Sequence, residues 1–296
     1  MSLLKPSGTN LGATELSRTT LAEKKLIQHS HSPCVTPKYV VSKLDAFKGR
    51  EPSDDRAGLL KFAYQGEADE WLVMDRRRNA SKLLRSEGAS FVNNHFWNCY
   101  ESEGDVVVQA VPATSAYLDA YFEQHLDAAP AWSELFQAPL ECRVPTDANA
   151  TVVACAPLLA ADAPIRFFDY PTFNPLFKMR ATYEYFYAIA PADDSSQWFD
   201  TLVKVRVAPT TKAEVVSQWS APGVYLTEAD FAPTGGSEDD GVLIAVLYNS
   251  TSDVSSLAIF DAKDLSLLSA SPLDYVVPFH AHGIVCPKGE ACYSNP

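Results

Sequence analysis

Apolar and polar residues alternate over short stretches in the second half of the chain. In residues 202–207, three valines occupy alternate positions, and Lys204 and Arg206 lie between them. A period of two is typical of a half-buried β-strand. Strand-length segments recur at residues 183–190, 202–207, 241–248 and 256–262, with turn residues between them. The pattern predicts antiparallel β structure.

The first half of the chain adds two strands and one helical segment. Residues 106–111 and 151–158 read as strands, whereas residues 115–137 place leucines and aromatics at mixed spacings of three and four. The mixed spacing predicts a helix. Short strands with one helical insertion fit a β-sandwich or a β-propeller, and no visible repeat of about 40 residues separates these two folds.

Composition limits the kind of protein. The chain has 296 residues, of which 47% are hydrophobic, so it can bury a sizeable core. Its formal charge of -13 would repel phosphates, which argues against a nucleic-acid partner. No stretch approaches the roughly 20 apolar residues of a membrane-spanning helix. Residues 1–20 form a poorly defined polar segment, and we expect one domain over residues 21–296.

The cysteines and the glycosylation sequons bear on the compartment. Six cysteines show no CxxC pair and no regular spacing, which argues against a zinc ribbon or a disulfide framework and predicts reduced thiols. Three Asn-x-Ser/Thr sequons begin at Asn79, Asn149 and Asn249, but no signal segment precedes them. We therefore expect a cytoplasmic or organellar protein, the plastid included, that is not secreted.

Three histidines lie in motifs of known type. Residues 31–41 read His-Ser-Pro-Cys-Val-Thr-Pro-Lys-Tyr-Val-Val, residues 94–101 read Asn-His-Phe-Trp-Asn-Cys-Tyr-Glu, and residues 277–283 read Val-Pro-Phe-His-Ala-His-Gly. In order and content they resemble the second, third and fourth histidine motifs of the carotenoid cleavage oxygenase family. Residues 238–242 and 261–265 resemble landmarks of that family's C-terminal blades.

The resemblance implies an all-β fold, a seven-bladed β-propeller with Fe(II) on its axis, bound by four histidines from different blades. It assigns His31, His95 and His282 as three of these metal ligands. Neutral imidazoles suit Fe(II), and open coordination positions leave room for O2 beside an apolar substrate. The implied enzyme is an Fe(II)-dependent dioxygenase that splits a conjugated C=C bond of a carotenoid or apocarotenoid into two carbonyl products. Stilbene cleavage and retinoid isomerisation are alternatives within the same family.

Two carboxylates match positions at which the family orients its metal ligands. Glu228, in Tyr-Leu-Thr-Glu, stands where the family has Tyr-Pro-x-Glu, although Leu226 replaces the proline. Asp169, in Phe-Asp-Tyr-Pro, stands where the family usually has Glu. Its shorter side chain is expected to fall short of a direct hydrogen bond or to bridge through water. Carboxylates that accept the distal N–H of a ligand histidine fix its tautomer and orientation.

The other histidines and Glu101 have different expected roles. His29 and His280 lie two positions before a predicted ligand and could share its face, but a hydrogen-bonding or surface role is expected for both. His125 falls in the helical segment and is expected at the surface. Glu101 matches the third motif and is expected to support the structure near His95.

One part of the family pattern has no match. The first histidine motif, rich in His-Pro-His, would lie upstream of His31, and the chain contains no His-Pro dipeptide. We therefore expect a partial propeller, a truncated form whose N-terminal blades and first ligand are missing. The stretch between the second and third motifs, which often contacts membranes in the family, is mostly polar here and argues against membrane contact. A non-catalytic fragment that binds lipid or protein is the alternative from a different class.

Overall fold

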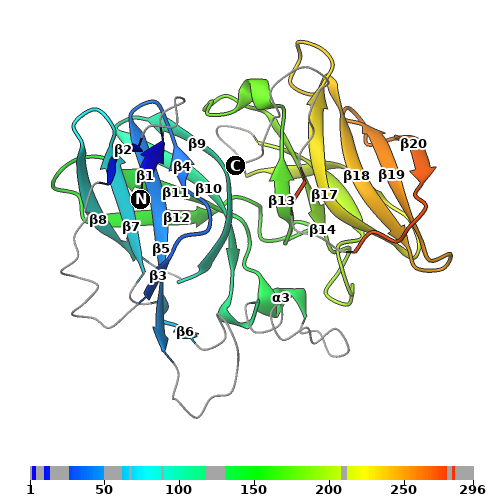
Figure 1. Cartoon of the computed structure of the whole chain (residues 1–296), viewed down its shortest axis with the longest axis horizontal. Coiled ribbons are helices and arrows are strands. Elements are labelled where there is room, and N and C mark those ends of the chain that lie inside the picture. The colour runs from blue at the N-terminus through cyan, green and yellow to red at the C-terminus, as the bar shows by residue number, and fades with distance from the viewer. Residues whose placement is uncertain are drawn as a thin grey trace.

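Antiparallel β-strands make up most of the molecule. The computed structural model describes residues 2–4, 10–13, 27–49, 62–66, 69–87, 90–117, 131–207, 212–278 and 282–283. Within these residues the strands form a ten-stranded sheet, two four-stranded sheets and a hairpin of β1 (Ser2–Leu4) with β2 (Asn10–Ala13). Figure 1 shows the ten-stranded sheet curling into a barrel-like half, with the two smaller sheets beside it. The expected all-β class is confirmed.

The ten-stranded sheet combines two consecutive meanders. The first contains β3 (Ile27–His29), β4 (Cys34–Val35), β5 (Tyr39–Gly49), β6 (Phe62–Tyr64), β7 (Glu70–Asp75) and β8 (Ala80–Glu87). The second contains β9 (Val92–Ser102), β10 (Asp105–Ala113), β11 (Leu140–Pro145) and β12 (Val152–Pro157). Their last strands, β8 and β12, pair in parallel, which gives the order β3-β5-β7-β8-β12-β11-β10-β9. In this order β9 lies at the opposite end from β3 and β5.

Two further meanders of four strands follow. One contains β13 (Asp169–Thr172), β14 (Tyr185–Ala190), β15 (Thr201–Arg206) and β16 (Glu214–Ser220), with the 3-10 turn η4 (Pro175–Phe177) after its first strand. The other contains β17 (Val224–Pro233), β18 (Gly241–Asn249), β19 (Val254–Asp261) and β20 (Leu267–Pro272). Both sheets keep their strands in chain order, as propeller blades do.

Helical residues appear at both ends of the segment that was expected to be a helix. Residues 115–117 are helical, and α3 (Trp132–Leu135) follows residues 118–130, which lie outside the described range. Trp132 is buried, and its ring centroid lies 4.8 Å from that of Phe199. The insertion therefore packs against the sheet that begins with β13.

The main hydrophobic core includes the interface between the last two sheets. The ring of Tyr187 in β14 lies 5.5 Å from that of Phe231 in β17, and Trp219 in β16 lies 4.8 Å from Phe260 in β19. The Tyr187 hydroxyl donates to the backbone carbonyl of Ala262 at 2.8 Å. This bond satisfies two polar groups that would otherwise be buried without a partner.

Lys204 departs from the expectation for a half-buried strand. Its side chain is buried, and its Nζ donates to Asp239 Oδ2 at 2.8 Å and to the Lys263 carbonyl at 2.9 Å. Both partners belong to connections of the neighbouring sheet. The neighbouring sheet covers the face of β15 on which Lys204 lies, the face that the sequence pattern predicted to be polar. The ion pair with Asp239 compensates the buried charge.

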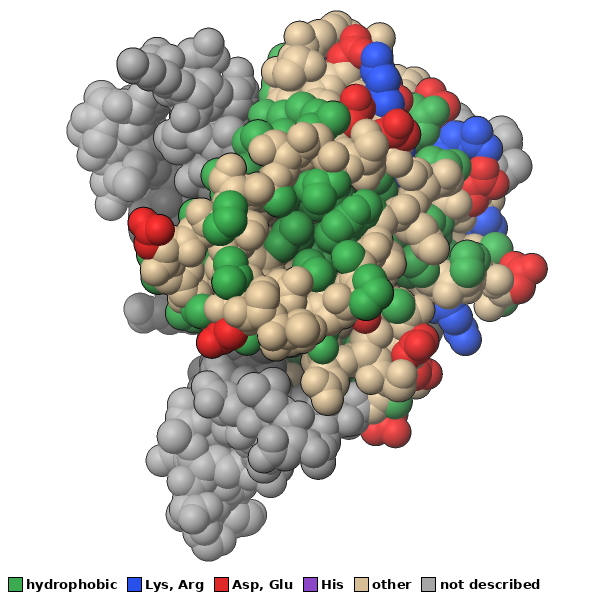
Figure 2. Space-filling model, turned by 90° about the vertical axis from the view of Figure 1, so that its right-hand side faces the viewer, with side chains coloured by type: hydrophobic (Ala, Val, Ile, Leu, Met, Phe, Trp, Pro, Cys, Tyr) green, Lys and Arg blue, Asp and Glu red, His purple; other side chains and the backbone are tan. Residues whose placement is uncertain are grey.

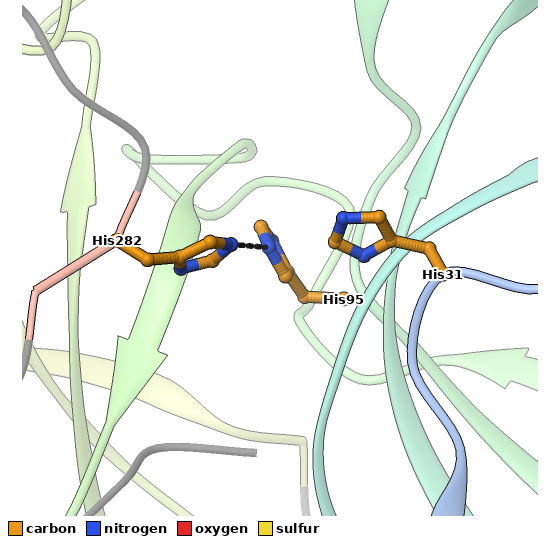
Figure 3. Close-up of side chains that lie close together, drawn as sticks. All are labelled: His31, His95 and His282. Atoms are coloured by element: carbon orange, nitrogen blue, oxygen red, sulfur yellow. Dashed lines mark hydrogen bonds between the residues drawn. The ribbon is translucent and has the colours of Figure 1, made fainter.

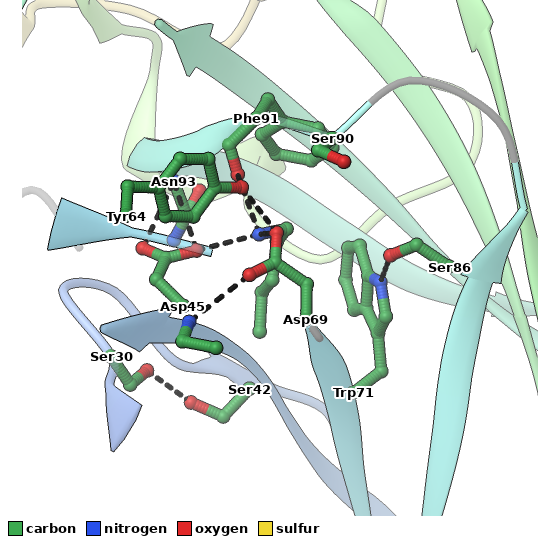
Figure 4. Close-up of polar contacts among 12 residues, drawn as sticks. Ser30, Ser42, Asp45, Tyr64, Asp69, Trp71, Ser86, Ser90, Phe91 and Asn93 are labelled. Atoms are coloured by element: carbon green, nitrogen blue, oxygen red, sulfur yellow. Dashed lines mark hydrogen bonds and ion pairs between the residues drawn. The ribbon is translucent and has the colours of Figure 1, made fainter. Parts of the chain in front are cut away.

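A buried ionic cluster links β5 to the residues that precede β7 and β9 (Figure 4). Lys43 Nζ lies 2.6 Å from Asp45 Oδ1, 2.5 Å from Asp69 Oδ2 and 2.6 Å from the carbonyl oxygen of Phe91. The Tyr64 hydroxyl donates to Asp69. Burial raises the pKa of Asp45 to about 7, although Lys43 opposes this. Protonation of Asp45 therefore changes the charge of a buried cluster that helps to hold the barrel-like half together.

Four cysteines are paired, so the prediction of reduced thiols is wrong for them. One disulfide joins Cys34 of β4 to Cys99 of β9, and another joins Cys142 and Cys155, which stand directly opposite each other in β11 and β12. Spacing along the chain did not predict these pairs because strand pairing and sheet packing bring the sulfurs together. The two cysteines beyond residue 284 lie outside the described residues.

The last sheet turns one apolar face outward. Val246 stands opposite Leu257 and Ile244 opposite Ile259, and all four side chains are at least partly exposed. Figure 2 shows a hydrophobic area ringed by uncharged atoms on the side of the molecule that carries β18–β20. Among the described residues, none of the helices has the length and apolar character needed to cross a bilayer.

Candidate metal centre

His31 lies in the connection between β3 and β4. Its side chain is exposed, and its Nδ1 lies 3.2 Å from the hydroxyl oxygen of the buried Ser32. Just beyond it, the backbone N–H of Thr36 donates to the Tyr39 carbonyl, and the Tyr39 N–H donates back to Thr36 Oγ1. This tight turn leads the chain from the His31 segment into β5.

His95 lies within β9 and is 7% exposed. It stands opposite Val111 of β10, and the register of this pairing shifts on both sides of it. Successive side chains of a regular strand point to opposite faces, yet Asn94 and His95 both reach Asp169. The irregular register explains this, because β-bulges reorient side chains and are common beside active sites.

His282 belongs to the short described segment 282–283. Its side chain is 50% exposed. The backbone N–H of Gly283 donates to Glu228 Oε2 at 2.8 Å, so β17 holds this segment in place.

The three predicted ligands meet between the barrel-like half and the last two sheets (Figure 3). One nitrogen from each imidazole lies within 4.8 Å of the others. His95 Nε2 and His282 Nε2 are 3.4 Å apart, and the ring centroids of His31 and His95 are 5.0 Å apart. Nitrogens bound to one ion at about 2.1 Å can be at most about 4.2 Å apart, so small side-chain rotations would close the site around an ion.

Asp169 contacts His95 directly, so the expectation that its shorter side chain would fall short is wrong. Its Oδ1 lies 2.6 Å from His95 Nδ1 and also accepts from the Tyr170 backbone N–H at 2.8 Å, while Oδ2 accepts from Asn94. The start of β13 lies against β9. Because the two strands are close, the shorter aspartate side chain still reaches His95.

Glu228 serves the second histidine in a similar way. Its Oε2 lies 3.3 Å from His282 Nδ1. Glu228 is 8% exposed and sits where the register of β17 with β18 shifts. Two of the three imidazoles therefore have a carboxylate at Nδ1, which favours the tautomer that leaves the Nε2 lone pair free.

Burial and the carboxylates set the protonation of the site. Burial opposes the charged form of His95, but the adjacent Asp169 outweighs it and raises the pKa of His95. Burial and the nearby His95 lower the pKa of His282. Burial also raises the pKa of Glu228 to about 7. The site thus places two carboxylates, Asp169 and Glu228, beside the imidazoles. A bound cation would balance the negative charge of these carboxylates.

Tyr170 and Asn94 are site residues that sequence reasoning missed. The backbone of Tyr170 has a φ of 50°, which is rare for a bulky residue, and its ring lies 5.2 Å from that of His95 and 5.7 Å from that of His282. Asn94 binds the Asp169 carboxylate. Their positions beside Asp169 and His95 in the motifs are the sequence feature that could have identified them.

Glu101 has the structural contacts expected of it. Its Oε1 accepts from Thr36 Oγ1 and from the Lys38 backbone N–H, both at 2.9 Å, and its Oε2 lies 2.7 Å from Lys38 Nζ. Among the remaining histidines, 125 and 280 lie outside the described residues, as does the side chain of residue 29.

The donor set suits a transition-metal ion. Imidazole nitrogen binds Fe, Zn, Cu and Ni, and three protein ligands leave coordination positions for small molecules. The three histidines form such a group within the described chain, and their neighbouring carboxylates provide the supporting hydrogen bonds that metal-binding histidines usually have.

Comparison with known proteins links this chain to a family. The family model described as retinal pigment epithelial membrane protein, RPE65, matches residues 9–286. A carotenoid dioxygenase of Neurospora crassa is 29% identical over 123 residues, which are 41% of this chain and 19% of that protein.

Solved structures share the fold. A variant of Synechocystis apocarotenoid oxygenase superposes with a TM-score of 0.74 at 18% identity, covering 99% of this chain and 57% of that one. The cobalt-substituted Synechocystis enzyme gives 0.72 at 18% identity over 95% and 56%, and a chimera of that enzyme with RPE65 gives 0.73 at 18% identity over 95% and 56%. The chain therefore spans little more than half of these structures.

Proposed function

Because the chain belongs to the RPE65 family of carotenoid oxygenases, we propose that His31, His95 and His282 hold Fe(II) in a site for oxidative cleavage of a carotenoid or apocarotenoid. The observation that carries this proposal is the convergence of three imidazoles from distant parts of the chain. Carboxylates at Nδ1 of two of them add to it. A Synechocystis enzyme with a similar fold has a cobalt-substituted form, which supports metal binding by a protein of this fold.

The protein's own groups would prepare the site for this chemistry. Bound Fe(II) would supply the activation of O2. Asp169 and Glu228 hold the Nδ1 protons of their histidines, so that the Nε2 atoms stay available as ligands. In the proposed reaction the conjugated C=C bond breaks and each carbon receives one oxygen atom of O2, giving two carbonyl products.

Aromatic side chains next to the histidines suit an apolar polyene. The ring of Tyr170, beside His95, lies 5.8 Å from that of Phe199, which lies 4.8 Å from that of Trp132. These residues are buried. Tyr170 thus connects the histidines to a buried aromatic cluster, and apolar surroundings of this kind suit an apolar ligand.

We expect the 296-residue chain alone to bind iron weakly and to cleave carotenoids slowly. The three described histidines hold an ion less tightly than the four that the family resemblance implies, and the half-exposed His282 leaves the described site open to water. Water competes for coordination positions and removes the dry enclosure that suppresses side reactions. The competing hypothesis, a non-catalytic fragment that binds lipid or protein, predicts no metal binding.

Anaerobic reconstitution tests the proposal. The chain is loaded with Fe(II), bound iron is measured, and O2 and an apocarotenoid are added while aldehyde products are followed by chromatography. We expect weak iron binding and slow product formation in the wild type, loss of both in His95→Ala, and retention of both in His125→Ala. Equal iron and product in wild type and His95→Ala would overturn the proposed site.

A further inference from the structure

A disulfide joins the two segments that carry His31 and His95. Cys34 stands three residues after His31, and Cys99 stands four residues after His95. The bond spans 65 residues of sequence, and both cysteines are buried. A covalent cross-link therefore lies within four residues of each of two proposed ligands.

In the described residues, side-chain contacts and not backbone pairing between strands attach the His31 segment to β9. β4 pairs with β5, whereas β9 pairs with β10 at the other end of the sheet order. The disulfide bridges this separation. Glu101, two residues after Cys99, adds hydrogen bonds to Thr36 and Lys38 on the same segment. Together these contacts fix residues 34–38 against the strand that carries His95.

The disulfide can restrain the segment that carries His31. His95 lies within a paired strand and bonds to Asp169, and His282 bonds to Glu228. His31 lies outside a strand with an exposed side chain, and its Nδ1 lies 3.2 Å from the hydroxyl of the neighbouring Ser32. An anchor three residues away restricts its backbone before a metal arrives, which reduces the conformational entropy lost on binding.

We propose that the Cys34–Cys99 disulfide positions His31 for metal binding, and that opening it weakens the affinity of the three-histidine site. This inference rests on the proposed function, because it assumes that these histidines bind a metal. It makes the two cysteines positioning residues that act through His31.

The second disulfide provides a matched control. Cys142 and Cys155 join strands that already pair with each other, and neither stands next to a proposed ligand in sequence. The test compares C34A/C99A with C142A/C155A in the full chain. Co(II) affinity is measured anaerobically by titration, and hydrogen exchange of residues 30–38 is measured by mass spectrometry in the metal-free proteins.

We expect C34A/C99A to lose about tenfold or more in Co(II) affinity, comparable to removal of a supporting partner of a metal ligand, and to exchange faster over residues 30–38. C142A/C155A should match the wild type in both measurements. Unchanged affinity in C34A/C99A, or an equal loss in both variants, would overturn the inference.

Two further measurements separate the remaining outcomes. If C34A/C99A does not fold, C142A/C155A is reduced with dithiothreitol, which gives two electrons and two protons to each disulfide and closes to its own cyclic disulfide. The reductant, itself a Co(II)-binding dithiol, is removed anaerobically, and Co(II) affinity is compared between oxidised and reduced C142A/C155A, in which Cys34–Cys99 is the described disulfide that reduction opens. Equal affinity in the two forms overturns the inference. Co(II) binding by the wild type that His95→Ala abolishes would uphold the proposed site even then, whereas no binding by the wild type would overturn both.

Discussion

Asp169 reaches His95 Nδ1 over 2.6 Å although its side chain is one methylene shorter than the glutamate that the family pattern places there. Asn94 and the Tyr170 backbone N–H occupy further lone pairs of the same carboxylate. Three donors from two elements therefore hold Asp169 in place. The start of β13 acts as a support for the proposed ligand in β9.

Removing the charge of Asp169 should loosen the metal. We expect Asp169→Asn to weaken Co(II) or Fe(II) binding about 10- to 100-fold, because the amide can turn its NH2 toward His95 and no longer fixes the tautomer. Metal titration measures the change. Asp194→Asn, which alters a carboxylate bonded to Ser133 at the surface, should keep wild-type affinity. Equal affinities in the two variants would contradict the role of Asp169.

Glu228 should matter for a different ligand. We expect Glu228→Gln to reduce metal affinity by about 10- to 100-fold as well, because it weakens the bond that orients His282. The matched control is Glu214→Gln, whose carboxylate pairs with Arg206 on the surface. An unchanged dissociation constant for Glu228→Gln would make this glutamate an ordinary buried acid.

The buried cluster around Lys43 should make stability depend on pH. The pKa of Asp45 is raised from 3.8 to about 7, so the folded protein binds this proton more tightly than the unfolded chain. The resulting stabilisation is complete below the unfolded pKa and is lost as the pH rises through about 7. Between about pH 5 and about pH 8, we expect the Tm of the wild type to fall on the order of 5 °C more than that of Asp45→Asn. Parallel Tm profiles from circular dichroism would rule this out.

The hydroxyl of Tyr187 should stabilise the interface between the last two sheets. We expect Tyr187→Phe to lower the free energy of unfolding by about 1–2 kcal/mol, because the buried Ala262 carbonyl loses its donor. Tyr248→Phe removes an exposed bond to Asp253 and should cost less than about 0.5 kcal/mol. Urea denaturation compares the two, and a similar loss in both would speak against the buried bond.

Local patterns in the sequence determined the class of fold and the identity of the candidate site. The alternation in residues 202–207 and the short apolar segments 106–111 and 241–248 predicted strands, and β15, β10 and β18 occupy these positions. Such patterns are readable because the pleat of a strand sets side-chain alternation without reference to the rest of the molecule. The motifs around the histidines selected the residues that the structure brings together, through their resemblance to a family.

Only the tertiary structure decided how far apart these residues lie. The direct bond from Asp169 to His95, the burial of Lys204 and the pairing of Cys34 with Cys99 all departed from what the sequence predicted. Each depends on the distance between elements that are remote in the chain. That distance is set by sheet packing and by shifts of strand register, such as those beside His95, and a period of two along one strand carries no information about either.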